Sequence, residues 1–480
     1  MECTIKLPQQ QTHTSVPMGT NLLEALRSGG YIVDAPCGGR GTCGKCRVIV
    51  DGVEMPACQT TVDRDMTVEL PEKGRDSILT AGISVAAAGS GACHIAFDIG
   101  TTTIAGFLID GSGRELCSES CENPQRTYGA DVISRIQYAL KTDSNIQTKL
   151  IRECIAQMAN TLCQKSGVPP ESIQNVSIVG NPAMQQLFLG ISPENLAKLP
   201  FAPVLTELRE VAAKDYIPGL ENAKLLIVPD ISGFVGADTI ACLLATDLDS
   251  REDWTLLVDI GTNGEMVLGN KDRMVASSTA AGPALEGANI SCGMRGRPGA
   301  IDHVWAKDGK LHCSTIGGLK AEGICGSGLI DAADAALELG LINSRGRVQT
   351  EDRCLRLAEG VTLTQDDIRQ LQLAKGAIAA GIRLMAEHLE IELEDIQKVF
   401  LAGAFGTFMD PASACGIGLL PPELEGRIEA VGNAAGSGAK LLACDPGAKE
   451  RVLTLLDKTE FLDLASVPDF QYIFAENMIF

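Results

Sequence analysis

Apolar and polar residues alternate in short runs over residues 1–75. The runs ECTIKL, THTSVP, CRVIV and MTVEL approach the period of two that is typical of strands. One helical segment interrupts them, from Asn21, which can cap a helix, to Ser28, and Gly29 and Gly30 follow it. The pattern predicts a small mixed sheet wrapped around one helix.

Residues 76–92 are rich in Gly, Ala and Ser and have little periodicity, so we expect a linker there. After the linker, strand-like and helix-like stretches alternate to the end of the chain, which indicates α/β layers. In this part HIAFDIGTTTIAGFLID (94–110) and TLLVDIGTNGEMVLG (255–269) share an apolar strand, an Asp-Ile-Gly-Thr turn and a second apolar strand. The repeat predicts two related halves, at 93–247 and 248–480.

Charge and cysteine usage narrow the classes of partner. The formal net charge of -21 disfavours nucleic acid and anionic membrane surfaces, because both need clustered Lys and Arg. The first residues have no basic patch followed by an apolar stretch, and we expect neither a secretory signal nor a transmembrane span. Apart from one cluster, the 17 cysteines are scattered singly, which favours a reducing cytoplasm and small buried thiols.

Four cysteines near the N-terminus have the arrangement of an iron–sulfur site. Five residues separate Cys37 from Cys43, two separate Cys43 from Cys46, and Cys58 follows after eleven more. The glycines of this loop let it wrap closely and direct N–H groups at sulfur. Zinc stays open as an alternative, although only Cys43 and Cys46 form the close pair that zinc sites usually show. Unligated thiols would explain neither the glycines nor the spacing.

The spacing of five and two resembles that of vertebrate-type and bacterial [2Fe-2S] ferredoxins, and it implies a β-grasp domain over residues 1–75. Cys58 departs from this resemblance, because such ferredoxins usually place the fourth ligand several tens of residues later. A short hairpin, CRVIVDGVEMPAC, with Asp51 and Gly52 as its turn, would still return the chain to the cluster.

Both Asp-Ile-Gly-Thr turns have the residue types of a phosphate cradle, which needs exposed N–H groups, hydroxyls and close approach. Asp98 and Asp259 each stand at a strand end just before the turn, where they can hold Mg²⁺ through water. One such turn could be an ordinary hairpin, but two copies are a stronger signal. The predicted contacts are Gly100, Thr101 and Thr102 in the first turn and Gly261, Thr262 and Asn263 in the second.

The two turns together resemble the nucleotide cleft of the superfamily of actin, sugar kinases, acetate kinase and heat-shock chaperones (ASKHA). The resemblance implies a duplicated, RNase H-like ATPase that binds ATP with Mg²⁺. GFVGADTIACLL (233–244) and GNAAGSGAKLLA (432–443) resemble its two connecting helices, whose small residues pack closely at the hinge. VFLAGAFG (399–406) resembles the adenosine motif, in which Gly403 and Gly406 let the backbone lie against the nucleoside.

Two further glycine-rich segments have no assigned role. GICGSGLIDAADAAL (323–337) could offer a helix N-terminus to an anion, or could be a tight turn before a core helix. The loop at 277–301 holds Glu286, Arg295 and Arg297 as candidate polar contacts.

A ferredoxin module ahead of this ATPase, with the motifs NPQRTYGADVISRI (123–136), VGNPAMQQLFLGI (179–191) and PFAPV (200–204), resembles the reductive activators of corrinoid proteins. That family implies an ATP-hydrolysing enzyme that passes one electron from a [2Fe-2S] cluster to the Co(II) corrinoid of a methyltransferase system, regenerating Co(I). It also implies a low-potential electron donor and leaves a homodimer as an option. The residues alone leave open an ATP-dependent small-molecule kinase with an accessory redox domain, or a redox-sensing nucleotide-binding protein.

Overall fold

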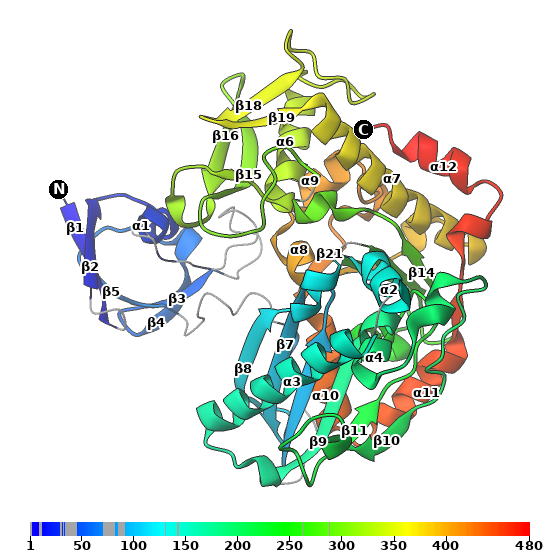
Figure 1. The fold of residues 1–480 in the computed structure, drawn as a ribbon. Helices are drawn as coiled ribbons and strands as arrows, with labels where there is room; N and C mark the ends of the chain where they lie inside the picture. Colours follow the sequence, from blue (N-terminus) through cyan, green and yellow to red (C-terminus); the bar gives the residue numbers. More distant parts are fainter. Residues whose placement is uncertain are drawn as a thin grey trace.

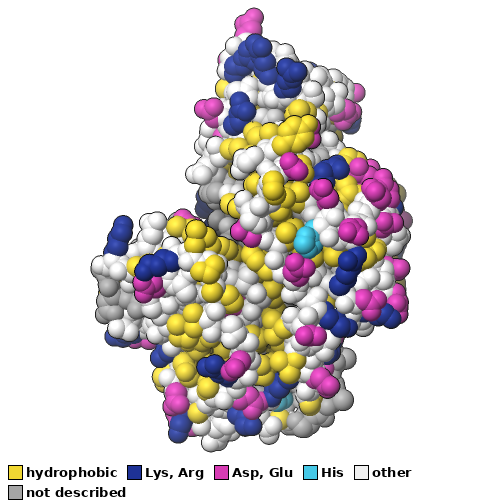
Figure 2. Space-filling view, turned by 90° about the vertical axis from the view of Figure 1, so that its right-hand side faces the viewer, with side chains coloured by type: hydrophobic (Ala, Val, Ile, Leu, Met, Phe, Trp, Pro, Cys, Tyr) yellow, Lys and Arg dark blue, Asp and Glu magenta, His cyan; other side chains and the backbone are white. Residues whose placement is uncertain are grey.

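The structure is a computed structural model that describes residues 2–8, 12–28, 31, 33, 46–70, 82–84, 92–129, 131–141, 144–261, 263–287 and 289–480. Figure 1 shows the N-terminal strands (blue) to one side of a larger body of sheets and helices. Among the described residues, no helix is long and apolar enough to cross a membrane. On the face drawn in Figure 2, acidic and basic side chains are interspersed, with apolar side chains between them.

The N-terminal domain is a five-stranded sheet in the order β2-β1-β5-β3-β4, with β1 parallel to β5 and the other neighbours antiparallel. Helix α1 begins after Asn21, whose Oδ1 accepts from the Leu23 N–H at 3.0 Å, so the predicted cap is confirmed. The elements are β1 (Glu2–Leu7), β2 (Thr12–Pro17), α1 (Leu22–Ser28), β3 (Arg47–Val50), β4 (Val53–Pro56) and β5 (Met66–Glu69).

A small apolar core holds this domain together. Ile5 and Leu7 of β1 and Leu22 and Leu26 of α1 are fully buried, which places the helix against one face of the sheet. Each such side chain contributes roughly 1.5–3 kcal/mol by leaving water. The predicted mixed sheet on one helix is therefore confirmed.

The larger body contains two six-stranded sheets, in the orders β10-β11-β9-β6-β7-β8 and β21-β20-β12-β13-β14-β22. Their shared part is an antiparallel trio followed by two parallel strands, so the duplication read from the sequence is confirmed. The strands are β6 (Cys93–Ile99), β7 (Thr103–Asp110), β8 (Glu115–Glu122), β9 (Ile173–Gly180), β10 (Arg209–Ala212), β11 (Lys224–Ile227), β12 (Thr255–Ile260), β13 (Gly264–Gly269), β14 (Met274–Thr279), β20 (Lys398–Ala402), β21 (Ile428–Gly432) and β22 (Thr459–Phe461).

Helices cover both sheets, and two small sheets complete the body. The small sheets are formed by β15 (Ala300–Lys307), β16 (Lys310–Thr315) and β17 (Gly323–Ile324), and by β18 (Cys354–Ala358) and β19 (Val361–Thr364). The helices are α2 (Val132–Lys141), α3 (Ser144–Ser166), α4 (Pro182–Leu189), α5 (Ala237–Ala245), α6 (Gly326–Glu338), α7 (Gln365–His388), α8 (Gly403–Phe408), α9 (Pro411–Gly416), α10 (Ala434–Cys444), α11 (Ala448–Lys458) and α12 (Phe470–Asn477).

Helices α5 and α10 cross at the centre of this body. A Cβ at Gly438 of α10 would lie 1.9 Å from the Ala241 carbonyl oxygen of α5, so only glycine allows the crossing. Although α10 lies in sequence between β21 and β22 of the second sheet, it packs on the first sheet: Ser177 Oγ of β9 donates to the Ala439 carbonyl at 2.6 Å. One apolar core then joins Phe107 of the first sheet to side chains of the second. The two repeats are thus interlocked.

Candidate functional site

The two Asp-Ile-Gly-Thr turns hold their aspartates at equivalent positions. Asp98 pairs with Ala105 in the β6–β7 hairpin, and Asp259 pairs with Glu265 in the β12–β13 hairpin, each one residue before the first strand ends. The strand–turn–strand prediction is therefore correct for both copies. Thr262 lies outside the described residues.

Four carboxyl groups interact electrostatically between the turns. Burial raises the pKa of Asp98 to about 7, where the Asn433 hydrogen bond lowers it and the charge of Asp259 raises it further. Burial, and then the charge of Asp98, raises the pKa of Asp238 to about 7. Burial raises the pKa of Asp259 to about 6.

Glu265 is the fourth member, and burial followed by the charges of Asp238 and Asp259 raises its pKa well above the usual range. Negative charges that raise one another's pKa are the condition that a bound cation relieves. Among the residues that the structure describes, no three His, Cys, Asp or Glu side chains could hold a metal ion together. Mg²⁺ bound with a nucleotide would relieve this repulsion, and Asp98 and Asp259 are the residues that would hold it.

Asn433 connects the first turn to the hinge helix α10. Its Oδ1 accepts from the Gly436 N–H as the cap of α10, and its Nδ2 donates to Asp98 Oδ2 at 3.0 Å. The linker reaches the same point: Ser437 Oγ donates to the Ile83 carbonyl at 3.0 Å, and a Cβ at Gly82 would lie 2.4 Å from the Asn433 carbonyl oxygen. A short series of contacts thus joins the ferredoxin linker to Asp98.

The second turn is closed by its own backbone, because the Gly261 N–H donates to the Asn263 carbonyl at 2.9 Å. Gly403, the first residue of α8, has φ +82° and approaches so closely that a Cβ would lie 2.6 Å from Asp259 Oδ1. Gly406 of α8 packs instead on Leu401 of the preceding strand β20, and the nearest atom lies 3.0 Å from its would-be Cβ. Gly403 therefore lies against a carboxyl group of the site, whereas the nearest neighbour of Gly406 is Leu401.

Two of the four predicted cluster cysteines lie together in the N-terminal domain. The Cys58 N–H donates to Cys46 Sγ at 3.4 Å, and both residues are buried. The β3–β4 hairpin makes this possible, with Asp51 at φ 49° and Gly52 at φ 85° in its turn, as predicted. A backbone N–H directed at a buried sulfur fits an iron–sulfur ligand. Cys37 and Cys43 lie outside the described residues.

Three family models match the chain. Residues 5–71 match a 2Fe-2S iron-sulfur cluster binding domain, residues 93–251 the RACo middle region, and residues 253–480 the C-terminal domain of RACo, the ASKHA domain. The chain is 35% identical over 417 residues to the corrinoid activation enzyme RamQ of Eubacterium limosum, covering 80% of this chain and 70% of the relative. The chain belongs to the RACo family.

Two further members support this membership. A reductase of a Co(II) methylated amine-specific corrinoid protein from Methanosarcina barkeri is 28% identical over 396 residues, which cover 76% of this chain and 72% of the reductase. The solved structure of a reductive activator for a corrinoid, iron–sulfur protein superposes with a TM-score of 0.72 at 27% identity, covering 100% of this chain and 98% of that one. The expected ferredoxin domain and duplicated ASKHA fold are therefore confirmed.

The two glycine-rich segments without an assigned role, at 323–337 and 277–301, make structural contacts in this RACo-family chain. At the N-terminus of α6, a Cβ at Gly326 would lie 1.9 Å from the Leu285 carbonyl oxygen, which is the close packing that the tight-turn interpretation expects. In the loop at 277–301, Arg295 Nη1 lies 2.8 Å from Glu122 Oε1 of the other half. Arg297 pairs with Glu322 at 3.6 Å.

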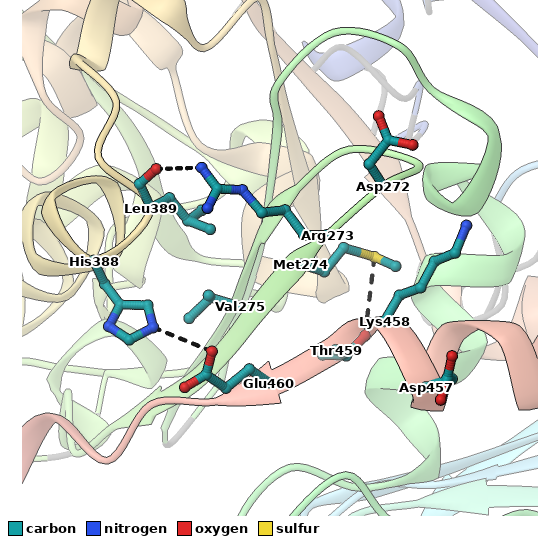
Figure 3. Close-up of a pocket in the computed structure, with 10 residues that line it drawn as sticks. All are labelled: Asp272, Arg273, Met274, Val275, His388, Leu389, Asp457, Lys458, Thr459 and Glu460. Carbon is teal, nitrogen blue, oxygen red and sulfur yellow. Dashed lines mark hydrogen bonds and ion pairs between the residues drawn. The ribbon is translucent and has the colours of Figure 1, made fainter.

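A pocket of 520 Å³ lies elsewhere in this RACo-family chain, and Figure 3 shows it between the end of α7, β14 and β22. There His388 Nε2 lies 3.3 Å from Glu460 Oε2, and Arg273 Nη2 donates to the Leu389 carbonyl at 2.5 Å. None of the four clustered carboxyl groups lines it.

Sequence reasoning missed Asp238, Glu265 and Asn433 as site residues of the RACo fold. Each stands in or beside a motif that was singled out, so a signal existed: Asp238 opens the first connecting helix and Asn433 precedes the second. Asn before a run of small helical residues is a capping signal, but no local rule tells which carboxylate its other amide atom meets.

Proposed function

We propose that this chain is an ATP-dependent reductive activator, which transfers one electron from a [2Fe-2S] cluster to the Co(II) corrinoid of a methyltransferase corrinoid protein and regenerates Co(I). The transfer is uphill, and each ~59 mV of unfavourable potential costs a factor of ten for one electron. ATP can offset that cost only by favouring a state of the protein in which electron transfer is less unfavourable. A low-potential electron donor must supply the cluster.

The observation that carries the proposal is the contact between linker and nucleotide side. Ile83 lies within the linker segment. Its carbonyl accepts from Ser437 Oγ, one turn into the helix whose cap, Asn433, donates to Asp98. A change at Asp98 on nucleotide binding therefore has a direct path to the segment that carries the ferredoxin domain. This is the coupling that an ATP-driven activator requires.

Within this proposal, Asp98 and Asp259 orient Mg²⁺ through water, and the two turns receive the phosphates. The proposed contacts are Gly100, Thr101, Thr102, Gly261, Thr262, Asn263 and Gly403, with Gly406 supporting the turn that presents Gly403. Cys37, Cys43, Cys46 and Cys58 would hold the cluster, which when bound supplies the electron. No disulfide joins any of the fifteen described cysteines, which supports a reducing, cytoplasmic setting.

The test mixes the intact chain anaerobically with a low-potential reductant and a Co(II) corrinoid protein, and follows the cobalt spectrum with and without MgATP. We expect Co(I) to accumulate with MgATP and much more slowly without it. Equal accumulation without nucleotide, or none with any corrinoid protein tried, would rule the proposal out.

A matched pair of variants ties the electron to the proposed ligands. Cys58→Ser should lose iron and sulfide and with them corrinoid reduction, because a hydroxyl is a poor cluster ligand. Cys3→Ser is the control, since Cys3 is a buried cysteine of the same domain, on β1, that is not among the proposed ligands. Full cluster content in Cys58→Ser would remove Cys58 from the ligand set.

A further inference from the structure

Two residues of the motif at 123–136 hold the backbone of the first turn. The three carbonyl groups of Gly100, Thr101 and Thr102 each accept a hydrogen bond from it. Asn123 Nδ2 donates to the Gly100 carbonyl at 2.9 Å, and the Asn123 backbone N–H donates to the Thr102 carbonyl at 2.9 Å. Arg135 Nη2 donates to the Thr101 carbonyl between them at 2.6 Å.

Arg135 is held so that its guanidinium can make this bond. The residue lies on α2, which Asp131 caps by accepting from the Ser134 N–H at 2.8 Å, and it has no exposed surface. Arg135 Nε donates to the Gly129 carbonyl at 2.9 Å, and Nη1 lies 3.1 Å from Met184 Sδ. A charged side chain is buried this completely only when its donors are used, so its orientation is fixed.

These bonds decide which way the turn presents its N–H groups. In a trans peptide the C=O of one residue and the N–H of the next point in opposite directions. Because the Gly100 and Thr101 carbonyls point at Asn123 and Arg135, the N–H groups of Thr101 and Thr102 point away from them. Both threonines keep some exposed surface, so the turn is not sealed from solvent.

We propose that Arg135 and Asn123 are positioning residues for phosphate recognition, which lock the first turn with the Thr101 and Thr102 N–H groups facing the phosphates of a bound nucleotide. The inference rests on the proposed nucleotide site and adds residues that do not touch the nucleotide. A third residue completes the support: Asn181, the cap of α4, donates from Nδ2 to Thr101 Oγ1 at 3.0 Å. Preformed N–H donors need no reorganisation when the phosphates arrive.

The test compares a phosphate-bearing ligand with one that has no phosphate. Binding of MgADP and of adenosine to the intact chain is measured by anaerobic calorimetry for the parent, Arg135→Lys and Asn123→Ser. Lysine keeps the charge but lacks the planar fork, and serine is too short to reach the Gly100 carbonyl. We expect MgADP to bind about tenfold more weakly in each variant, as loss of one charge-assisted or buried hydrogen bond would cause, and adenosine to change less than twofold.

Arg152→Lys is the matched control. Arg152 lies in the same half, is partly buried, and donates from Nε to the Phe188 carbonyl at 2.7 Å while stacking on Tyr216, so it is a carbonyl-bonded arginine that does not contact the turn. We expect it to leave both affinities unchanged.

The outcomes separate this inference from the proposed function. If the parent binds MgADP and both variants bind it equally well, the positioning role is wrong while the nucleotide site stands. Equal weakening of MgADP and adenosine would show a packing defect and would also overturn it. A parent that binds neither ligand removes the nucleotide site, and the positioning role falls with it.

Discussion

The two Asp-Ile-Gly-Thr turns have nearly the same sequence and strand register, but different groups support them. Side chains brace the first: Arg135 and Asn123 hold its carbonyls, and Asn181 holds the Thr101 hydroxyl. The second is closed by its own Gly261–Asn263 backbone bond, and another backbone segment, at Gly403, lies against its aspartate.

The difference shows that duplication preserves a strand–turn–strand unit without preserving its support. A turn braced by buried side chains is stiff, because each carbonyl has a fixed donor. A turn that meets a neighbouring backbone depends on how closely that neighbour approaches. We therefore expect the first turn to be sensitive to substitutions of the side chains that hold its carbonyl groups. We expect the second turn to be sensitive to added volume at Gly403, next to its aspartate.

The largest expected effect tests whether the aspartates of the two turns are equally important for ATP hydrolysis. Asp98→Asn and Asp259→Asn should each lower ATP hydrolysis by roughly 100-fold, because each removes a charge that orients the cation. Phosphate release under saturating MgATP measures this. Asp63→Asn serves as the control, since Asp63 is an exposed ferredoxin residue paired with Arg64. Near-parental rates in either site variant would show that its turn does not serve the cation.

The next effect concerns added volume at the second turn. Gly403→Ala should lower ATP hydrolysis at least tenfold, since its methyl group would lie 2.6 Å from Asp259 Oδ1. A non-glycine residue at positive φ also costs about 1–2 kcal/mol of folding stability. Gly340→Ala separates the two causes, because Gly340 has φ +66° with nothing within 4 Å of its would-be Cβ. The midpoint temperature of thermal unfolding should fall in both variants, and the rate of ATP hydrolysis only in Gly403→Ala. A loss of hydrolysis in both variants would point to backbone strain alone.

A smaller effect concerns the repulsion among the buried carboxyl groups at the two turns. The pKa of Asp98 and of Asp238 is raised from 3.8 to about 7, so the folded state of the protein is more stable when these two carboxyl groups are protonated. Their contribution to stability is present below pH 3.8 and is lost as the pH rises through about 7. Without Mg²⁺ and nucleotide, the protein should therefore lose stability between pH 5 and pH 8.

Asp238→Asn should recover part of that loss, on the order of 1 kcal/mol at pH 8 and little at pH 5, because it removes one buried charge. Denaturant unfolding at the two pH values measures the free energy of unfolding. Asp63→Asn again provides the exposed comparison. A gain of the same size at both pH values would mean that the charge of Asp238 is not the cause.

The smallest effect concerns the ion pair between the halves. Arg295→Gln should raise the KM for ATP by no more than about threefold, and 0.5 M salt should erase the difference, because the Arg295 and Glu122 side chains are 48% and 69% exposed. Arg297→Gln, which removes a pair within the second half, should leave KM unchanged. A larger, salt-independent effect in Arg295→Gln would assign Arg295 a direct contact with nucleotide.

The sequence by itself determined the local units. Asn21 caps α1, Asp51 and Gly52 form the β3–β4 turn, and both Asp-Ile-Gly-Thr segments form hairpins, because these features depend on side chains and dihedral angles of neighbouring residues. The small residues of α5 and α10 likewise predicted a close helix crossing, and Gly438 packs against Ala241 at that crossing.

Only the tertiary structure decided which groups meet. Asn433 reaches Asp98 from 335 residues away, α10 packs on the sheet of the other repeat, and Arg135 finds the Thr101 carbonyl across 34 residues. A local pattern cannot encode such partners, because they follow from how two interlocked sheets share one core and from the need to satisfy every buried donor. The sequence therefore identified the two turns, and packing determined how differently they are supported.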